Sequence, residues 1–193
     1  MLSSRLEAIH IARAKLDLNP LYLDTETTGI EKTSEIVEVS VVDDQGQIVF
    51  ESLVKPSRPI PRDVIRIHGI TDEDVKNAPN WMVVWPKVES VLAGRIVGIY
   101  NAEFDLRLIQ QTHARYRMPL TSLSFSYFCI MKLYAQYYGE WNRARGNYRY
   151  HSLEDAGRHL RISLQNTHRA LDDSLLARAI LHRMAEDVSA NRS

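Results

Sequence analysis

The chain has 193 residues, of which 45% are hydrophobic and 25% are charged, and its 24 basic and 24 acidic side chains cancel. This length and composition predict one globular domain with a substantial core. The balanced charge argues against a protein that coats long nucleic acids, which needs many cationic contacts with phosphates, but it permits a small grip on a strand end.

Membrane spans, secretion and internal disulfides are not expected either. No apolar run reaches the ~18 residues that a membrane span needs. The charged, amphipathic pattern of residues 1–15 is not that of a secretory signal. The single cysteine, Cys129, excludes an internal disulfide and is typical of a reducing compartment. We therefore expect a cytoplasmic protein.

Hydrophobic periodicity and turn residues predict helices and strands along the whole chain. The first half is predicted to form a helix at 3–16, a strand from Leu21 to a turn at 27–29, a hairpin of strands 36–42 and 47–54, an extended segment set by Pro56, Pro59 and Pro61, and helices at 72–77 and 81–93. The second half is predicted to form a strand at 95–100, a helix capped by Asn101 and running to Arg115, a strand near 125–129, a loop at 139–150, and helices at 131–138, 152–160 and 170–186. A hairpin followed by alternating helices and strands favours an α/β fold in which a mixed five-stranded sheet is flanked by helices.

Four acidic residues occupy positions that the pattern assigns to the interior. Asp24 and Glu26 lie two apart in the first strand, so their side chains leave the same face. Asp105 falls within the apolar stripe of the helix after Asn101, and Asp173 lies on the axis of the apolar stripe of the last helix. Buried like charges are costly unless a cation bridges them. The pattern therefore predicts a divalent-metal site.

Each of these residues also has a simpler explanation. Asp105 or Asp173, taken alone, is an acid favoured by the positive end of a helix dipole, and Asp24 alone could cap a turn. His168 precedes Asp173 by five positions, which on a helix would turn the two side chains about 140° apart. The two converge only if His168 lies in the loop before the helix. The coincidence of four misplaced acids favours a functional cluster.

Three sequence motifs contain these residues. Their positions and sequences are Leu23–Gly29, LDTETTG; Asn101–Asp105, NAEFD; and His168–Asp173, HRALDD. A further segment, Ile67–Thr71, reads IHGIT. Through these motifs, in order over about 21–184, the chain resembles the DnaQ-like, DEDDh branch of 3′-5′ exonucleases in the RNase H-like superfamily, which includes the proofreading epsilon subunit of bacterial DNA polymerase III.

The resemblance implies an RNase H-like fold and a division of the chain. Residues 1–19 would be an N-terminal helical extension, residues 20–187 the exonuclease domain, and residues 188–193 a short polar tail. The chain departs from the family pattern at Tyr100, where histidine is frequent, and at Cys129-Ile130, where Asp-Thr is frequent. Neither departure belongs to the catalytic set.

The resemblance also implies a mechanism. Asp24, Glu26 and Asp173 would hold one divalent ion, and Asp24 would share a second ion with the scissile phosphate, supported by Asp105. Oxygen ligands favour Mg²⁺ or Mn²⁺, and two such ions can activate water and stabilise the leaving 3′ oxygen. His168 would be the general base. The expected activity is release of nucleoside 5′-monophosphates from the 3′ end of single-stranded DNA.

Substrate contacts are expected from residues around these motifs. The three threonines that interleave or follow the first carboxylates could face the terminal nucleotide, and two further residues would touch the strand end by analogy: Thr25, Thr27, Thr28, His68 and Asn101. In the predicted loop, Arg143, Arg145 and Arg149 lie among aromatic residues and would grip a single strand. Ordinary surface arginines on a solvated loop explain them equally well.

Other functions stay open. An RNA-trimming 3′-5′ exoribonuclease would carry the same motifs, because the contact that reads the 2′-hydroxyl group is not visible in them. A non-catalytic nucleic-acid-binding module is disfavoured by five intact catalytic positions. A DNA polymerase catalytic subunit would be the partner of a proofreading enzyme, although we find no polymerase-binding tail or clamp-binding motif.

Overall fold

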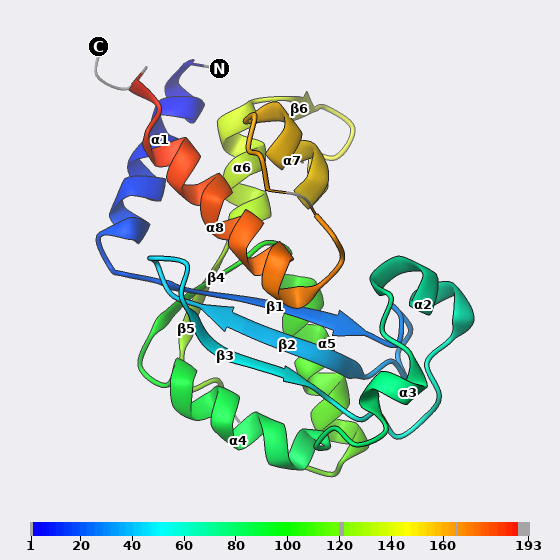
Figure 1. The fold of residues 1–193 in the computed structure, drawn as a ribbon. Coiled ribbons are helices and arrows are strands. Elements are labelled where there is room, and N and C mark those ends of the chain that lie inside the picture. The colour runs from blue at the N-terminus through cyan, green and yellow to red at the C-terminus, as the bar shows by residue number, and fades with distance from the viewer. Residues whose placement is uncertain (1, 120–121, 165, 189–193) are drawn as a thin grey trace.

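A five-stranded sheet forms the centre of the computed structural model, which describes residues 2–119, 122–164 and 166–188 (Figure 1). The strand order is β3-β2-β1-β4-β5. β1 pairs antiparallel with β2 and parallel with β4, so the sheet is mixed, as predicted. The strand bounds are β1 Leu21–Thr27, β2 Ile36–Val42, β3 Ile48–Leu53, β4 Ile96–Ile99 and β5 Ser126–Cys129.

Helices cover both faces of this sheet (Figure 1). α1, α6 and α8 share one core with β1 and β2, while α4 and α5 pack against the opposite face. α7 packs on α8, and α2 and α3 lie beyond the carboxyl end of β1. The helix bounds are α1 Leu2–Leu16, α2 Arg62–His68, α3 Asp72–Val75, α4 Trp81–Leu92, α5 Ala102–Arg115, α6 Ile130–Tyr138, α7 Leu153–His159 and α8 Ala170–Ala185.

Alternation along β1 separates two hydrophobic cores. Leu21 and Leu23 belong to the core beneath α4 and α5, whereas Tyr22 belongs to the core shared with α8, because successive side chains of a strand leave opposite faces. β2 is covered on both faces as well, and each of its seven residues is buried. A charged side chain on either strand therefore needs a partner.

Helix α2 was not predicted. The prolines at 56, 59 and 61 indicated an extended segment leading to the helix at 72, but a helical turn begins at Arg62. Pro61 immediately precedes it with φ −60°. Proline fixes the backbone angle that a helix start requires, and the N–H it lacks would have no partner inside the helix. Proline thus indicates an extended segment in the sequence and, at position 61, also precedes the start of a helix.

The predicted loop at 139–150 contains a small hairpin of β6 Trp141–Asn142 and β7 Asn147–Tyr148. The side chain of Asn142 closes its turn by accepting hydrogen bonds from the backbone N–H groups of Ala144 and Arg145. Strands of two residues leave no periodic signal, so the sequence pattern does not reveal them.

α1 packs on the core of the domain. Ala8 and Ile9 are fully buried against α6 and α8. Arg5 also donates a hydrogen bond to Asp187 at 2.7 Å, which ties the start of α1 to the residues after α8. α1 and α8 share one hydrophobic core. The division of the chain into an extension at 1–19 and a domain at 20–187 stays a prediction.

The chain's remaining predicted features concern its ends and its surroundings. The polar tail predicted at 188–193 lies, apart from Val188, outside the described residues. Among the helices of the described ranges, none is both long enough and apolar enough to cross a bilayer. Cys129 is free.

Candidate active site

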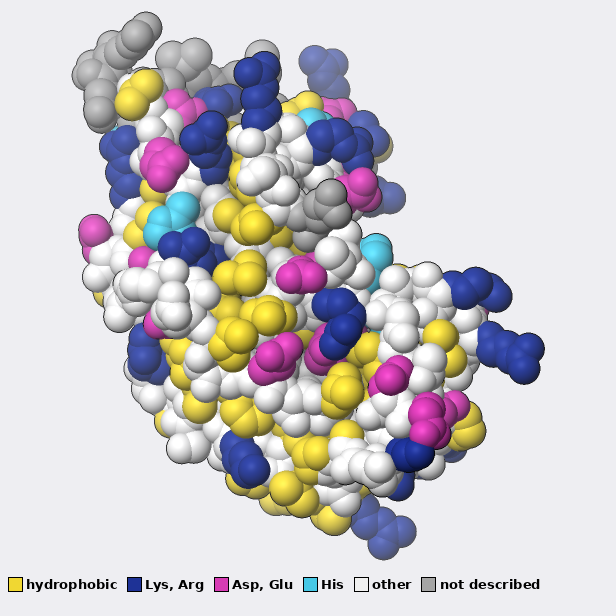
Figure 2. All heavy atoms as spheres, in the orientation of Figure 1, with side chains coloured by type: hydrophobic (Ala, Val, Ile, Leu, Met, Phe, Trp, Pro, Cys, Tyr) yellow, Lys and Arg dark blue, Asp and Glu magenta, His cyan; other side chains and the backbone are white. Residues whose placement is uncertain are grey.

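The second half of β1 is acidic on the face that α8 covers. Asp24 and Glu26 leave this face two and four residues after Tyr22, and both are half-buried. On the side of the molecule that carries α8, acidic side chains lie near the middle, whereas Lys and Arg side chains are densest around α6 and α7 (Figure 2). The neutral overall charge is therefore unevenly distributed.

Asp105 enters the site from the first turn of α5 and is only 3% exposed. The hydroxyl of Thr25 donates a hydrogen bond to Asp105 Oδ1 at 2.7 Å. Thr25 leaves the face of β1 opposite to Asp24 and Glu26. One strand thus presents two carboxylates and fixes a third. The substrate contact predicted for Thr25 stays a prediction, and its hydroxyl is already engaged.

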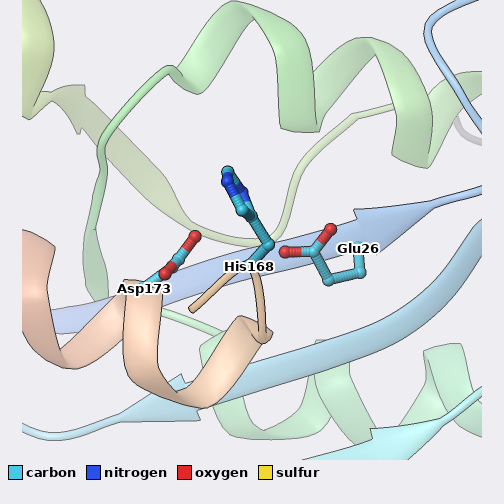
Figure 3. Close-up of side chains that lie close together, drawn as sticks. All are labelled: Glu26, His168 and Asp173. Atoms are coloured by element: carbon cyan, nitrogen blue, oxygen red, sulfur yellow. The ribbon is translucent and has the colours of Figure 1, made fainter. Parts of the chain in front are cut away.

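His168 and Asp173 lie on either side of the start of α8. The helix begins at Ala170, so His168 lies in the preceding loop. This is the position from which its side chain can converge with that of Asp173. The φ angle of His168 is 53°, a left-handed conformation that residues other than glycine rarely adopt. One ligand atom each of Glu26, His168 and Asp173 lies within 4.8 Å of the other two (Figure 3).

Burial raises the pKa of all four carboxyl groups. For Asp24, burial and then the charges of Asp105, Asp173 and Glu26 place the pKa well above its ordinary value. Burial, followed by repulsion from Asp173, raises the pKa of Glu26 to about 8. Burial also raises the pKa values of Asp105 and Asp173 to about 7, against hydrogen bonds that lower them. In the absence of a cation these groups cannot all be ionised at neutral pH.

The donor set fits a hard divalent cation. Asp173 Oδ1 is buried, and within the described part of the chain it has no hydrogen-bond partner. An unpaired buried carboxylate oxygen is costly unless a cation takes the place of the missing donor. Carboxylate oxygens are the ligands preferred by Mg²⁺ and Mn²⁺. Asp24 and Asp105 belong to the same electrostatic cluster, since the charge of Asp105 raises the pKa values of both Asp24 and Glu26.

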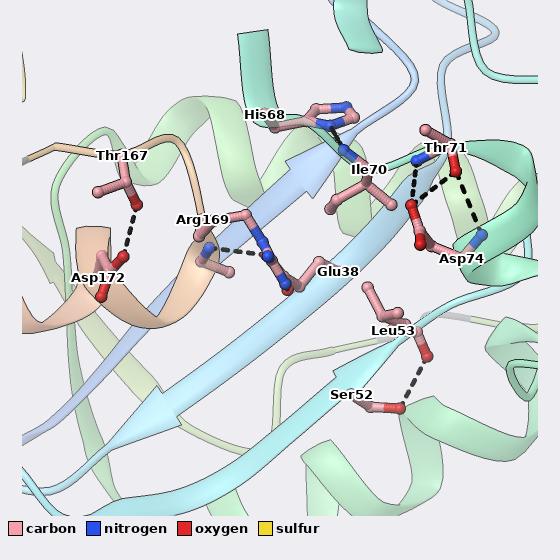
Figure 4. Close-up of polar contacts among 11 residues, drawn as sticks. Glu38, Ser52, Leu53, His68, Ile70, Thr71, Asp74, Thr167, Arg169 and Asp172 are labelled. Carbon is pink, nitrogen blue, oxygen red and sulfur yellow. Dashed lines mark hydrogen bonds and ion pairs between the residues drawn. The ribbon is translucent and has the colours of Figure 1, made fainter. Parts of the chain in front are cut away.

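Glu38 is a fifth acid of this region, and sequence reasoning missed it. It lies in β2 directly across from Glu26 and is 2% exposed. Its carboxylate forms an ion pair with Arg169 and accepts a hydrogen bond from the backbone N–H of Ala170 (Figure 4). An isolated acid in the run IVEVSVV was the available signal.

The other predicted substrate residues near β1 shape the backbone. Thr27 Oγ1 donates to Gly29 O at 2.8 Å, and Thr28 Oγ1 accepts from the N–H of Glu35 at 2.9 Å. His68 is buried: its Nδ1 accepts from the N–H of Ile70, which leaves Nε2 as the donor to Thr27 O, 3.2 Å away. A substrate contact by His68 would therefore have to use its ring carbons.

Of the remaining predicted contacts, Asn101 follows β4, which pairs in parallel with β1, whereas the predicted arginine grip lies on a separate hairpin. Asn101 is exposed just before α5, and its side chain does not cap the helix as predicted. Arg143, Arg145 and Arg149 line a hollow of about 520 Å³ on the hairpin of β6 and β7, where Arg149 pairs with Glu140 at 3.0 Å. The hairpin lies at the end of α6 that is remote from the carboxyl end of β1 (Figure 1).

Comparison with known proteins shows to which family the chain is similar. The RNase_T exonuclease family model matches residues 21–181. An uncharacterized exonuclease, CP81, of Escherichia phage 186 is 40% identical over 186 residues, covering 93% of this chain and 94% of the phage protein. The epsilon subunit of DNA polymerase III from Treponema pallidum is 34% identical over 90 residues, covering 45% of this chain and 42% of that subunit.

Solved structures share the fold. Exonuclease X, in a complex with 5′ overhanging duplex DNA, is 27% identical with a TM-score of 0.63 and covers 85% of this chain and 90% of its own. The nuclease domain of 3′hExo, a DEDDh family member bound to rAMP, is 20% identical with a TM-score of 0.71, covering 88% of this chain and 92% of its own. These likenesses confirm the RNase H-like architecture. Together with the family match and the acidic site, they show that the chain belongs to the RNase_T exonuclease family and is a hydrolytic 3′-5′ exonuclease of the DEDDh type.

Proposed function

We propose that this enzyme releases nucleoside 5′-monophosphates one at a time from the 3′ end of single-stranded DNA, by two-metal-ion hydrolysis with His168 as the general base. The proposal is carried by the convergence of acids from β1, α5 and α8 beside that histidine. The cluster lies in a chain with no net charge, which suits brief contact with a strand end better than extended binding.

The carboxylates would divide between two divalent ions. Asp24, Glu26 and Asp173 would hold one ion, and Asp24 and Asp105 would support the second. When bound, Mg²⁺ or Mn²⁺ would activate the attacking water and stabilise the leaving 3′ oxygen. The protein contributes the fixed position of each acid. The hydrogen bond from Thr25 restrains Asp105, for example, and the pairing of β1 with β2 sets the position of Glu26.

In this proposal, His168 accepts the proton of the attacking water. One of its ring nitrogens lies within 4.8 Å of carboxylate oxygens of Glu26 and Asp173, so a water molecule held by these acids is within reach. The side chain is also exposed, so the proton can pass on to solvent.

DNA is the proposed substrate because of the named relatives. Exonuclease X was solved with DNA, and the epsilon subunits belong to DNA polymerase III. The likeness to epsilon subunits also suggests proofreading or DNA repair in the cytoplasm, with a DNA polymerase catalytic subunit as a partner. The neighbour bound to rAMP makes RNA the alternative substrate that an experiment must separate.

We further propose that the hairpin of β6 and β7 grips the strand. Trp141 and Tyr148 pack edge to face with ring centroids 5.0 Å apart, beside the three arginines. Aromatic rings with cations bind single strands by stacking and phosphate contacts. Replacing Arg143, Arg145 and Arg149 together by glutamine is expected to weaken single-strand binding about 10-fold and to flatten its salt dependence. The matched control replaces the exposed cations Lys76, Lys87 and Arg117; equal weakening by both triple variants would contradict a specific grip.

The deciding experiment incubates the protein with 5′-labelled single-stranded DNA, duplex DNA and RNA of the same sequence, with Mg²⁺, Mn²⁺ or a chelator. We expect a ladder that shortens by one nucleotide from the 3′ end of single-stranded DNA, and no cleavage with chelator or in Asp24→Ala. Faster shortening of RNA would replace the DNA assignment. A ladder that persists in Asp24→Ala would contradict the site.

A further inference from the structure

Glu38 and Glu26 form a like-charge pair across two neighbouring strands. The register of β1 and β2 places them directly opposite each other, and Glu38 is 2% exposed. Opposed carboxylates at this spacing repel, and burial strengthens the repulsion. Glu26 can be compensated by a metal ion. Glu38 has a different partner, one that the protein itself supplies.

Arg169 is that partner. Its Nη2 lies 2.5 Å from Glu38 Oε1, and its Nε lies 3.1 Å from both carboxylate oxygens. The backbone N–H of Ala170 donates to Glu38 Oε2 at 2.9 Å (Figure 4). Both oxygens of Glu38 are therefore engaged, so Glu38 acts as a protein anchor and is not one more metal ligand.

The contact with Ala170 also caps α8. Residue 169 stands at the N-cap position of this helix, but its side chain makes no cap hydrogen bond. The first N–H groups of a helix need acceptors from outside it. Glu38 provides one from β2, 131 residues away from Arg169 in the sequence, and its negative charge suits the positive end of the helix. The start of α8 is thus fixed to the sheet by one buried carboxylate.

His168 directly precedes these two anchored residues. Its left-handed φ of 53° is strained, and such a conformation persists only where the surroundings impose it. On its other side, the N–H of His168 donates to Asn166 Oδ1 at 3.2 Å, an exposed contact. The carboxylate of Asp173 also accepts hydrogen bonds from the backbone of Thr167 and His168. Glu38 and Arg169 therefore hold the Arg169 side of the histidine, while Asp173 holds the other side.

We propose that Glu38 and Arg169 form a brace that positions His168 for proton transfer. The brace fixes the peptide that follows His168, so the imidazole stays near Glu26 and Asp173 before substrate arrives. Neither residue is catalytic in this role, because neither reaches the reacting atoms; both act through His168. This inference rests on the proposed role of His168 as the general base.

Variants of Arg169 test the brace, because its side chain is 46% exposed and its removal leaves no cavity in the core. Arg169→Met leaves the carboxylate of Glu38 buried without its ion-pair partner, so the variant is assayed at a temperature at which its melting curve shows it folded. In Arg169→Met, we expect kcat on single-stranded DNA to fall about 30-fold with KM changed less than about 3-fold, since misplacing a catalytic group by 1 Å can cost about 10²-fold. Arg169→Lys keeps the charge without the planar fork and should recover part of the loss. Arg183→Met, at an exposed arginine in the last turns of α8, is the matched control and should leave kcat unchanged.

A double-mutant cycle with His168→Ala tests whether the brace acts through the histidine. If it does, adding Arg169→Met to His168→Ala lowers kcat by less than about 3-fold, because the residue being positioned is already gone. Losses that multiply in full would overturn the proposal. So would an unchanged kcat in Arg169→Met alone.

Mn²⁺ binding to the DNA-free protein separates the brace from the metal site. Arg169→Met should bind Mn²⁺ within about 3-fold of the unsubstituted protein, whereas Asp173→Asn should bind it at least about 10-fold more weakly. Equal weakening in both would mean that Arg169 supports the metal ligands, and would overturn the proposal. A normal kcat in His168→Ala would overturn the general-base assignment together with the brace, whereas a low kcat there with a normal kcat in Arg169→Met overturns the brace alone.

Discussion

Two buried carboxylates, Glu35 and Asp173, have different surroundings in the fold. Glu35, just before β2, is 2% exposed, and its oxygens accept hydrogen bonds from Ser57 N–H at 2.9 Å and Ser57 Oγ at 2.7 Å. Asp173 is 5% exposed, and its Oδ1 has no partner among the described residues. Burial of an acid is therefore a poor sign of function by itself. A buried acid with a carboxylate oxygen that the fold leaves without a donor is the better sign.

The sharpest test of this difference is Asp173→Asn. The amide keeps the shape of the side chain but removes the charge that a cation needs, so we expect single-strand degradation to slow by about 10²- to 10³-fold. The metal-free variant should melt at the same temperature as the unsubstituted protein or higher, because one member of a repelling cluster is gone. Normal degradation, measured with 5′-labelled DNA, would contradict the metal-ligand assignment.

The repulsion also predicts a pH dependence of the metal-free protein. The pKa of Glu26 is raised to about 8 and those of Asp105 and Asp173 to about 7, so the folded state binds more protons than the unfolded state between about pH 4.5 and 8. Stability must then fall as pH rises through this window. We expect the melting temperature with chelator to be about 5 °C lower at pH 8.5 than at pH 5.5.

Mg²⁺ or Mn²⁺ should remove most of this fall, because the cation stabilises the ionised carboxylates of the folded state. Melting curves at both pH values, with and without the ion, provide the measurement. A metal-free melting temperature that rises from pH 5.5 to 8.5 would contradict the burial and mutual repulsion of these carboxyl groups.

Glu35→Gln should give the opposite result to Asp173→Asn. The amide cannot accept hydrogen bonds at both positions that the carboxylate uses, so we expect the free energy of unfolding to fall by about 2 kcal/mol. Degradation of single-stranded DNA should stay within about 3-fold of normal at a temperature where the variant is folded. Denaturant unfolding and the same degradation assay check both statements, and a large loss of activity without loss of stability would refute the comparison.

The smallest effect is expected for Thr25→Val, which keeps the side chain's shape and removes one hydroxyl. Asp105 would lose the hydrogen bond of 2.7 Å that restrains it, a change of about 1 kcal/mol. We expect degradation to slow about 5-fold, with a compensating rise in activity at higher Mn²⁺ concentration. Thr112→Val, at a buried hydroxyl that accepts from the backbone N–H of Ile36 and is not among the predicted substrate contacts, serves as the control.

The acidic site could be predicted because the spacings that indicate it lie within single strands and helices. The two-residue spacing of Asp24 and Glu26, and the position of Asp105 on an apolar helix stripe, follow from the periods of strands and helices. The loop position of His168 followed from helix geometry. Glu38 could not be assigned in this way, since its partner Arg169 is 131 residues distant and becomes a neighbour only in the folded chain.

The fold shows the same division between local and distant information. The strands and the long helices carry enough periodic residues to be predicted, whereas α2 and the two-residue strands of the hairpin do not. The packing of Ala8 and Ile9 into the core depended on contacts with α6 and α8, which no pattern within residues 2–16 contains. The hydroxyls of Thr25, Thr27 and Thr28 looked available in the sequence because their backbone and carboxylate partners were not visible there.

The hydrogen bond between Arg5 and Asp187 has a practical consequence for handling the enzyme. It brings the two described ends of the chain together beside the last turn of α8, whereas the acidic cluster lies at the first turn. Sixteen helical residues span about 24 Å. A fluorescent label or a bead attached beside the contact between Arg5 and Asp187 would therefore lie about one helix length from the acidic cluster, so immobilised molecules should keep the chemistry of that site.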